Sequence, residues 1–402
     1  MKKKLNKYLS IYLSILFFFA VFFLYQKHNT GNDSTISEWL INYSGGFTKR
    51  GIIGQISIFF SNLFLLELRD IIFIFQSLII AIYFFLLFCF LKNQYLERFF
   101  LLSIFTPIFL IYPLAEIEVL ARKEVFIFIF FIIYTFIPIH KFKYLRIFKL
   151  VLLPLSILVW EPVVFFLPFW IFFDLIIYKL KSFNASFIKE ALTYFPSLFI
   201  AGYFIFNPMS PDQHAQMALI LQNNFNEICY MSCALLKDKS SFYQQFQGNF
   251  GKYSFEVFFR YFLIILIGFG PLFILLYYSK LKNNNLLIIK KFTNINLLSI
   301  FLILLTPILL LFAIGYDWGR WVNISYIFSF ISFVHLYKNN LISINIKKLK
   351  NNKINLLNKK YFMIIFIIYC FTWNPKTVIT GDVASFPIYR IPYKLVKISL
   401  LN

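Results

Sequence analysis

The sequence predicts an all-α fold, a polytopic bundle of transmembrane helices that forms a single integral membrane domain over residues 1–402. Of the 402 residues, 60% are hydrophobic and only 14% are charged, and the mean hydropathy is +0.74. Soluble domains carry about 25% charged residues, so a soluble fold could not hide this much apolar surface. With 57 Phe and four Cys, the composition also excludes a disordered chain and a disulfide scaffold.

Eleven apolar runs predict the membrane spans. The first, residues 9–25, follows four lysines and has no small-residue cleavage site after it, so it indicates an uncleaved span with a cytoplasmic N-terminus. Several runs are shorter than the about 20 residues that cross a bilayer, so either their helices extend into the flanks or they lie where the protein thins the bilayer. The other ten are residues 72–91, 99–114, 125–139, 150–160, 163–178, 191–206, 256–278, 297–315, 324–337 and 361–373.

The stretch 150–178 is open to two interpretations, a single long span or a hairpin of two short ones. The residues Trp160-Glu161-Pro162 interrupt it. Proline removes a backbone donor and disrupts the preceding turn, which favours the hairpin.

Charge sets the predicted orientation. With a cytoplasmic N-terminus, more than half of the 39 lysines and arginines fall in inner segments, whereas nearly all of the 17 acidic residues lie elsewhere. The net charge of +22 therefore reflects the lysines and arginines of the inner segments, which set the topology and contact anionic lipid headgroups. No nucleic-acid partner is expected. A long loop at 207–255 and a tail at 374–402 are predicted outside.

Two of the four cysteines, Cys229 and Cys233, lie in the outer loop. A disulfide between them and two free thiols are both open. His214 is interpreted as an exposed loop residue. No metal site and no cofactor are expected, because no further ligand at metal-binding spacing follows the cysteines.

The first candidate functional segment is NYSGGFTKRGIIGQ, residues 42–55. Its glycines allow backbone amides to turn toward a ligand, and an apolar helix follows Lys49 and Arg50. The segment therefore predicts a phosphate cradle. The alternative is a tight turn whose basic side chains reach lipid headgroups.

The second segment is EIEVLARKE, residues 116–124. Arg122 and Lys123 are suited to gripping a diphosphate, since arginine offers paired donors. The alternative is a local pair between Glu118 and Arg122, which are four residues apart.

The third and fourth segments each contain a carboxylate and tryptophans. Glu161, between apolar runs, is expected to have a raised pKa that suits proton transfer; the alternative is an ion pair with Arg122 or Arg320. The sequence GYDWGRW, residues 315–321, places Asp317 near Arg320, and the alternative to glycan binding is a salt bridge. The rings predicted to stack on sugars are Trp160, Trp318 and Trp321.

These segments, in the order NYSGGFTKRGIIGQI, LARKEVFIF, WEPVVFFLPF and GYDWGRW, resemble the O-antigen polymerase-like inner-membrane proteins of bacterial surface-polysaccharide clusters. The resemblance implies that undecaprenyl-diphosphate-linked oligosaccharide units are joined at the periplasmic face of the inner membrane, with a chain-length regulator or other assembly proteins as partners. It implies Glu161 as the base, with Asp317 second. The implied diphosphate ligands are Lys49, Arg50, Arg122, Lys123 and Arg320.

The resemblance is incomplete, because such polymerases often carry arginine-rich outer loops and loop 207–255 contains only lysines as basic residues. A polyprenyl-phosphate-dependent membrane glycosyltransferase is the nearest alternative. That family uses a carboxylate in its first outer loop, where this chain offers Asp33 and Glu38. A transporter of lipid-linked sugars and a non-catalytic scaffold complete the alternatives.

Overall fold

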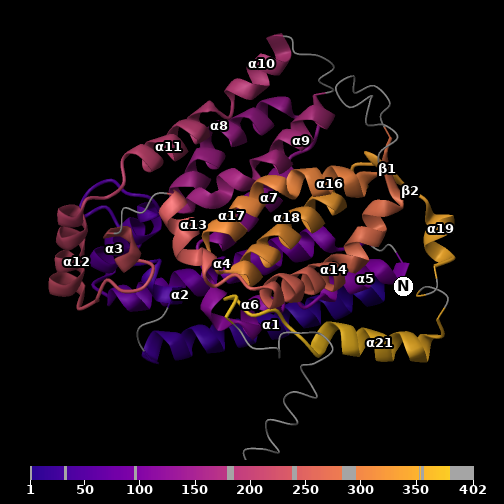
Figure 1. The fold of residues 1–402 in the computed structure, drawn as a ribbon, viewed down its shortest axis with the longest axis horizontal. Coiled ribbons are helices and arrows are strands. Elements are labelled where there is room, and N and C mark those ends of the chain that lie inside the picture. Colours follow the sequence, from indigo (N-terminus) through magenta and orange to yellow (C-terminus); the bar gives the residue numbers. More distant parts are fainter. Residues whose placement is uncertain are drawn as a thin grey trace, which may run out of the picture. The chain divides into compact units, whose positions relative to one another are not determined.

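The described part of the computed structural model is about 75% helical with almost no sheet, which confirms the all-α prediction (Figure 1). It describes residues 2–30, 34–94, 97–178, 185–237, 242–282, 296–352, 354 and 357–380. The chain divides into two compact units. The N-terminal unit contains residues 3–92 and 117–240, and the C-terminal unit contains residues 1–2, 93–116 and 241–402.

The N-terminal unit packs its helices around apolar faces of α3, α4, α7 and α8. Its elements are α1 (Lys2–Thr30), α2 (Ser34–Ser37), α3 (Gly51–Phe64), α4 (Leu68–Leu91), η1 (Ile117–Val119), α7 (Glu124–Phe136), α8 (Phe142–Val159), η2 (Glu161–Phe166), α9 (Leu167–Ile177), α10 (Ala185–Leu192), α11 (Phe195–Phe206), α12 (Pro211–Phe225) and η3 (Ala234–Lys237).

The chain reverses direction after α8. Helix α8 ends at Val159, and the short 3-10 helix η2 begins at Glu161, with proline in its first turn. On α8, Lys149 Nζ lies 2.6 Å from Asp174 Oδ2 on α9, although a continuous helix would separate these residues by about 37 Å. The structure therefore has a hairpin over 150–178, as the proline predicts.

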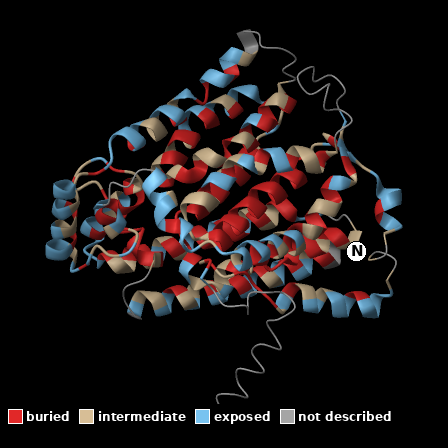
Figure 2. Ribbon diagram, in the orientation of Figure 1, coloured by how far each residue is buried: buried red, intermediate tan, exposed pale blue. Residues whose placement is uncertain are grey.

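The C-terminal unit is built around α18, which is buried along almost all of its length (Figure 2). A two-stranded antiparallel pair, with Ser279 opposite Ile344, joins the chain after α14 to the chain after α18. Its elements are α5 (Glu97–Phe105), α6 (Tyr112–Ala115), α13 (Phe242–Phe250), α14 (Phe255–Tyr277), β1 (Ser279–Leu281), α16 (Leu297–Leu305), η4 (Thr306–Ile308), α17 (Leu309–Ile314), α18 (Trp318–Lys338), β2 (Ile342–Ile344), α19 (Ile346–Lys350) and α21 (Lys359–Phe371).

Polar side chains of α18 donate hydrogen bonds to backbone carbonyls at the end of α5 and just after it. Asn323 Nδ2 donates to the carbonyls of Ile108 and Phe109, at 2.8 and 3.0 Å, and the Tyr326 hydroxyl donates to Ser103 at 2.6 Å. Buried carbonyls without partners would be costly. These bonds explain why a largely buried helix keeps polar residues.

Four helices in the described ranges are long and apolar enough to cross a membrane, which supports the prediction of a membrane protein. They are Leu5–Asn29, Leu68–Leu91, Phe255–Tyr277 and Leu297–Ile314. The count of eleven spans and their orientation stay predictions.

Two of the predicted segments differ in the structure. The run 99–114 is not one helix, because α5 ends at Phe105, just before Thr106 and Pro107, and α6 starts only at Tyr112. Helical backbone geometry is disfavoured at Thr106 because this residue precedes Pro107, so the helix ends there. The region 207–255, interpreted as a loop, contains α12 and α13.

Helix α3 packs against the chain before it through Gly54. A Cβ at this position would lie 2.0 Å from the carbonyl oxygen of Ile41 and 2.6 Å from that of Trp39. Because both neighbours are backbone atoms, we expect Gly54→Ala to destabilise the fold by about 3 kcal/mol. Thermal unfolding in detergent, followed by size-exclusion chromatography, measures the loss.

The matched control for that substitution is Gly202→Ala, on α11 of the same unit. A Cβ there would meet no atom within 4 Å, and alanine is favoured over glycine in helices by up to about 1 kcal/mol. Equal unfolding temperatures for the two variants would show that α3 does not pack as closely as the structure has it.

Candidate anion-binding site

Three of the four candidate segments meet in the N-terminal unit. Arg50 immediately precedes α3, Lys123 immediately precedes α7, and Glu161 opens η2. Each side chain therefore projects from the start of a helical element, where the chain can turn. Arg50 has a φ of 62°, a left-handed conformation that costs a non-glycine residue about 1–2 kcal/mol and that the surrounding contacts must stabilise.

The outer layer of this cluster joins Arg50 and Lys49 to one carboxylate. Arg50 donates from Nε and Nη2 to the two oxygens of Glu161, at 2.7 and 2.8 Å, and Lys49 Nζ lies 3.6 Å from Glu161 Oε1. Lys49 is 44% exposed, Arg50 20% and Glu161 21%. These three side chains are the part of the cluster that a ligand can reach.

The inner layer is buried. Arg122 donates to Glu38, whose carboxylate oxygen also lies 3.6 Å from Arg50 Nη1. Lys123 is 0% exposed, and its ammonium donates to the carbonyl oxygen of Arg50. Lys123 thus holds the backbone of Arg50, while Glu38 links the two arginines.

We name these six side chains the basic cluster; they are Glu38, Lys49, Arg50, Arg122, Lys123 and Glu161. Four basic and two acidic side chains give it a formal charge of +2. Arginine forks and lysines bind phosphate oxygens well, so the basic cluster is suited to an anion.

The pKa of Glu161 is opposite to the sequence-based expectation. Burial raises it, but the charges of Arg50 and Lys49 and the Arg50 hydrogen bond outweigh burial and lower the pKa to about 2. In this state the carboxylate is a weak proton acceptor. Its expected partners were Arg122 or Arg320, and the structure pairs it instead with Arg50 and Lys49.

Lys123 is the cluster lysine whose pKa falls toward neutrality. Burial, together with the charge of Arg50, outweighs the opposing charges of Glu38 and Glu161 and lowers the pKa of Lys123 to about 7. Between about pH 7 and 10.5 the unfolded chain therefore holds a proton that the folded chain lacks. Raising the pH through this window should stabilise the protein by up to about 1.4 kcal/mol per pH unit.

Urea unfolding of the wild type and of Lys123→Met at pH 7 and pH 9 measures this effect. The wild type is expected to gain stability relative to the variant as the pH rises. Lys141→Met, which changes an exposed lysine, controls for the loss of a positive charge. Parallel pH profiles of wild type and Lys123→Met would mean that Lys123 stays charged.

The segment 116–124 divides between the two units. Arg122 pairs with Glu38, which is 84 residues away, so this ion pair is long-range and differs from the local pair with Glu118 that the sequence leaves open. Glu116 belongs to the C-terminal unit, where its oxygens accept from Asn374, Lys376 and the Thr377 backbone at 3.0–3.1 Å. This carboxylate fastens the start of the predicted tail; the rest of that tail, 381–402, lies outside the described residues.

The fourth segment also lies in the C-terminal unit. Arg320 Nη1 is 3.3 Å from Asp317 Oδ2, so the salt-bridge alternative is present. Trp318 and Trp321 are buried, and Trp318 packs on Tyr253, Phe258 and Phe312.

Trp160 is fully buried beside Phe166 in the N-terminal unit. A sugar ring needs an open aromatic face to stack on. The three tryptophans therefore serve packing in this conformation, and the glycan-stacking assignment has no support from it.

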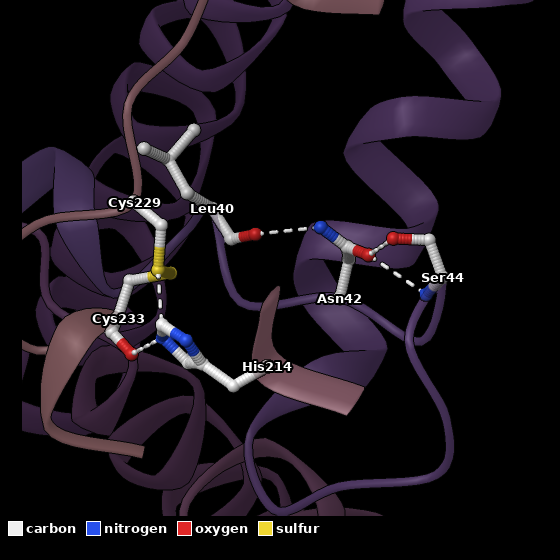
Figure 3. Close-up of a disulfide and its surroundings, with 6 residues drawn as sticks. All are labelled: Leu40, Asn42, Ser44, His214, Cys229 and Cys233. Carbon is white, nitrogen blue, oxygen red and sulfur yellow. Dashed lines mark hydrogen bonds between the residues drawn. A yellow bond between two sulfur atoms is a disulfide. The ribbon is translucent and has the colours of Figure 1, made fainter. Parts of the chain in front are cut away.

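Cys229 and Cys233 form a disulfide, with their Cα atoms 5.3 Å apart (Figure 3). This settles the alternative that the sequence leaves open. His214 is not an isolated surface residue: its Nε2 lies 3.3 Å from Cys229 Sγ and 3.2 Å from the Cys233 carbonyl oxygen.

Comparison of the chain with models of protein families, with curated proteins and with solved structures gives no match. The geometry of the basic cluster consequently carries the functional argument. Glu38 belongs to the basic cluster, although the sequence marks it only as a first-loop acid of the alternative transferase family and not as a partner of Arg50 and Arg122.

Proposed function

We propose that the chain is a membrane glycosyltransferase that polymerises lipid-diphosphate-linked oligosaccharide units. The observation that carries this proposal is the basic cluster, in which Lys49 and Arg50 are accessible above a buried layer of further charges. With Lys123 protonated, its formal charge of +2 matches a diphosphate diester. The order of motifs shared with O-antigen polymerase-like proteins supports undecaprenyl diphosphate as the carrier.

The ligand diphosphate would compete with Glu161 for Arg50 and Lys49. Once these cations turn to the phosphates, burial remains as the main influence on Glu161, and its pKa rises. Donor binding would thus convert a weak base into one suited to proton transfer.

A hydroxyl oxygen of the incoming unit forms a bond to the anomeric carbon, and the bond from that carbon to the diphosphate oxygen breaks. The hydroxyl proton goes to Glu161, and the lipid diphosphate leaves with the electron pair, stabilised by Arg50 and Lys49. The predicted orientation puts this reaction at the periplasmic face of a bacterial inner membrane.

The second candidate is a transferase that uses a polyprenyl monophosphate donor. It is favoured by the position of Glu38, a first-loop carboxylate that lies in the same cluster as Arg50 and Arg122. The other first-loop acid, Asp33, lies outside the described residues.

The surface-glycan ladder on a gel tests both candidates. A deletion strain is complemented with wild type, Glu161→Gln or Lys49→Ala, both changes at accessible side chains of the basic cluster, and Lys348→Ala is the control at an exposed lysine. If the deletion leaves one repeat on the anchor and only wild type and control restore long chains, polymerisation is supported. A shortened or altered repeat would support the second candidate, and an unchanged ladder would contradict both.

A further inference from the structure

Three potential metal ligands gather in the N-terminal unit, apart from the residues of the basic cluster. Within the described part of the chain, the ligand atoms of His214, Cys229 and Cys233 all lie within 4.8 Å of one another. Figure 3 shows the imidazole of His214 directed at the disulfide. Histidine and two cysteines are ligands that Zn²⁺ prefers.

The fold holds the histidine firmly. Helix α12 begins with Ser210 as N-cap and Pro211 in its first turn, and Ser210 and Gln213 form a reciprocal capping box. His214 follows directly, and its backbone N–H donates to the Ser210 carbonyl at 2.9 Å. The ring is therefore presented from an ordered first turn.

The cysteines lie on a compact turn opposite that helix. Cys233 N donates to the Tyr230 carbonyl at 3.0 Å, and η3 starts at the next residue. The Cys233 carbonyl accepts from Leu236 N at 3.2 Å as well as from His214. The Cys233 carbonyl therefore keeps its hydrogen bond from Leu236 N if His214 turns its Nε2 lone pair toward a metal.

We propose that Cys229, Cys233 and His214 form a Zn²⁺ site when the disulfide is reduced, so that this position alternates between a disulfide and a metal. A dithiol reductant supplies the two electrons: the S–S bond breaks, two thiols form, and the reductant becomes a disulfide. Zn²⁺ then displaces one proton from each thiol and binds neutral His214. Two thiolates cancel the charge of the metal, and the fourth position is left to water.

The geometry needs one substantial change. In a tetrahedral site with zinc–sulfur bonds of about 2.3 Å, the two sulfurs lie about 3.8 Å apart. The sulfurs of Cys229 and Cys233, which are bonded to each other in the disulfide, must therefore move apart after reduction. The distance from sulfur to imidazole nitrogen in such a site is about 3.6 Å, and His214 Nε2 is already 3.3 Å from Cys229 Sγ. Rotation of the two cysteine side chains brings the sulfurs into position.

Cobalt titration of the detergent-purified full-length chain tests the proposal. The chain is reduced with a dithiol, freed of reductant without oxygen, and titrated with Co²⁺, whose thiolate complexes absorb in the near ultraviolet. We expect one Co²⁺ per chain after reduction, no such absorption before it, and displacement by Zn²⁺. Because the oxidised and reduced forms of the wild-type chain are compared, the result does not depend on whether a variant folds.

Variants then identify the ligands. His214→Ala and Cys233→Ser should each weaken binding by about 100-fold or more, since even groups that only orient a ligand contribute 10–100-fold. His140→Ala and Cys89→Ser, which change a histidine and a cysteine outside the site, should bind as wild type. A reduced chain with titratable thiols at 229 and 233 but no cobalt absorption would overturn the proposal, as would unchanged binding by His214→Ala.

Discussion

Replacement of Arg50 by alanine should reduce glycosyl transfer by about 100- to 1000-fold, the usual cost of removing one preorganised group that stabilises charge in a transition state. Arg50 joins the two layers of the basic cluster: its side chain binds Glu161 and approaches Glu38, and its carbonyl accepts from Lys123. The measurement is the rate of chain extension with purified protein and lipid-linked substrate.

Arg50→Lys is the informative companion variant. It keeps the charge but loses the fork that makes two parallel hydrogen bonds, so we expect a rate between those of wild type and Arg50→Ala. Lys348→Ala should behave as wild type. If Arg50→Ala is folded and extends chains at the normal rate, the basic cluster is not the site of the donor phosphates.

The helices could largely be predicted from the sequence, because an apolar run long enough to span a bilayer is a local property. The predicted run 72–91 lies within α4, and the run 256–278 differs from α14 by one residue at each end. Breaks were harder to predict. The break after Phe105 depends on the proline and on Asn323 of α18, a distant residue that caps the exposed carbonyls.

Most residues of the candidate site could be predicted from the sequence, but which of them form ion pairs with one another could not. The chemistry of Arg50 and Glu161 marks each as a candidate, but they are 111 residues apart, and no local pattern shows that they meet. Glu116 and Arg122 are close in sequence and lie in different units. The expected pKa of Glu161 was wrong for the same reason: desolvation follows from apolar neighbours in sequence, whereas the opposing charges come from a distant segment.

Glu38→Gln is expected to lower the free energy of unfolding by about 3–5 kcal/mol. Glu38 is 0% exposed, and its partner Arg122 is 7% exposed. Glu38→Gln removes the carboxylate that the buried Arg122 guanidinium binds, and loss of one member of a buried ion pair costs more than the pair itself contributes. Thermal unfolding in detergent measures the loss, and Glu256→Gln, at an exposed position of α14, is the control.

A double variant separates stability from catalysis. Glu38→Gln with Arg122→Met removes both buried charges, so the stability lost in Glu38→Gln should return in large part. Transfer activity should stay low, because the Glu38 carboxylate that approaches Arg50 is then missing. If activity returns together with stability, the buried pair only holds the fold, and Lys49, Arg50 and Glu161 suffice for binding. If Glu38→Gln unfolds at the wild-type temperature, Glu38 and Arg122 are not a buried ion pair.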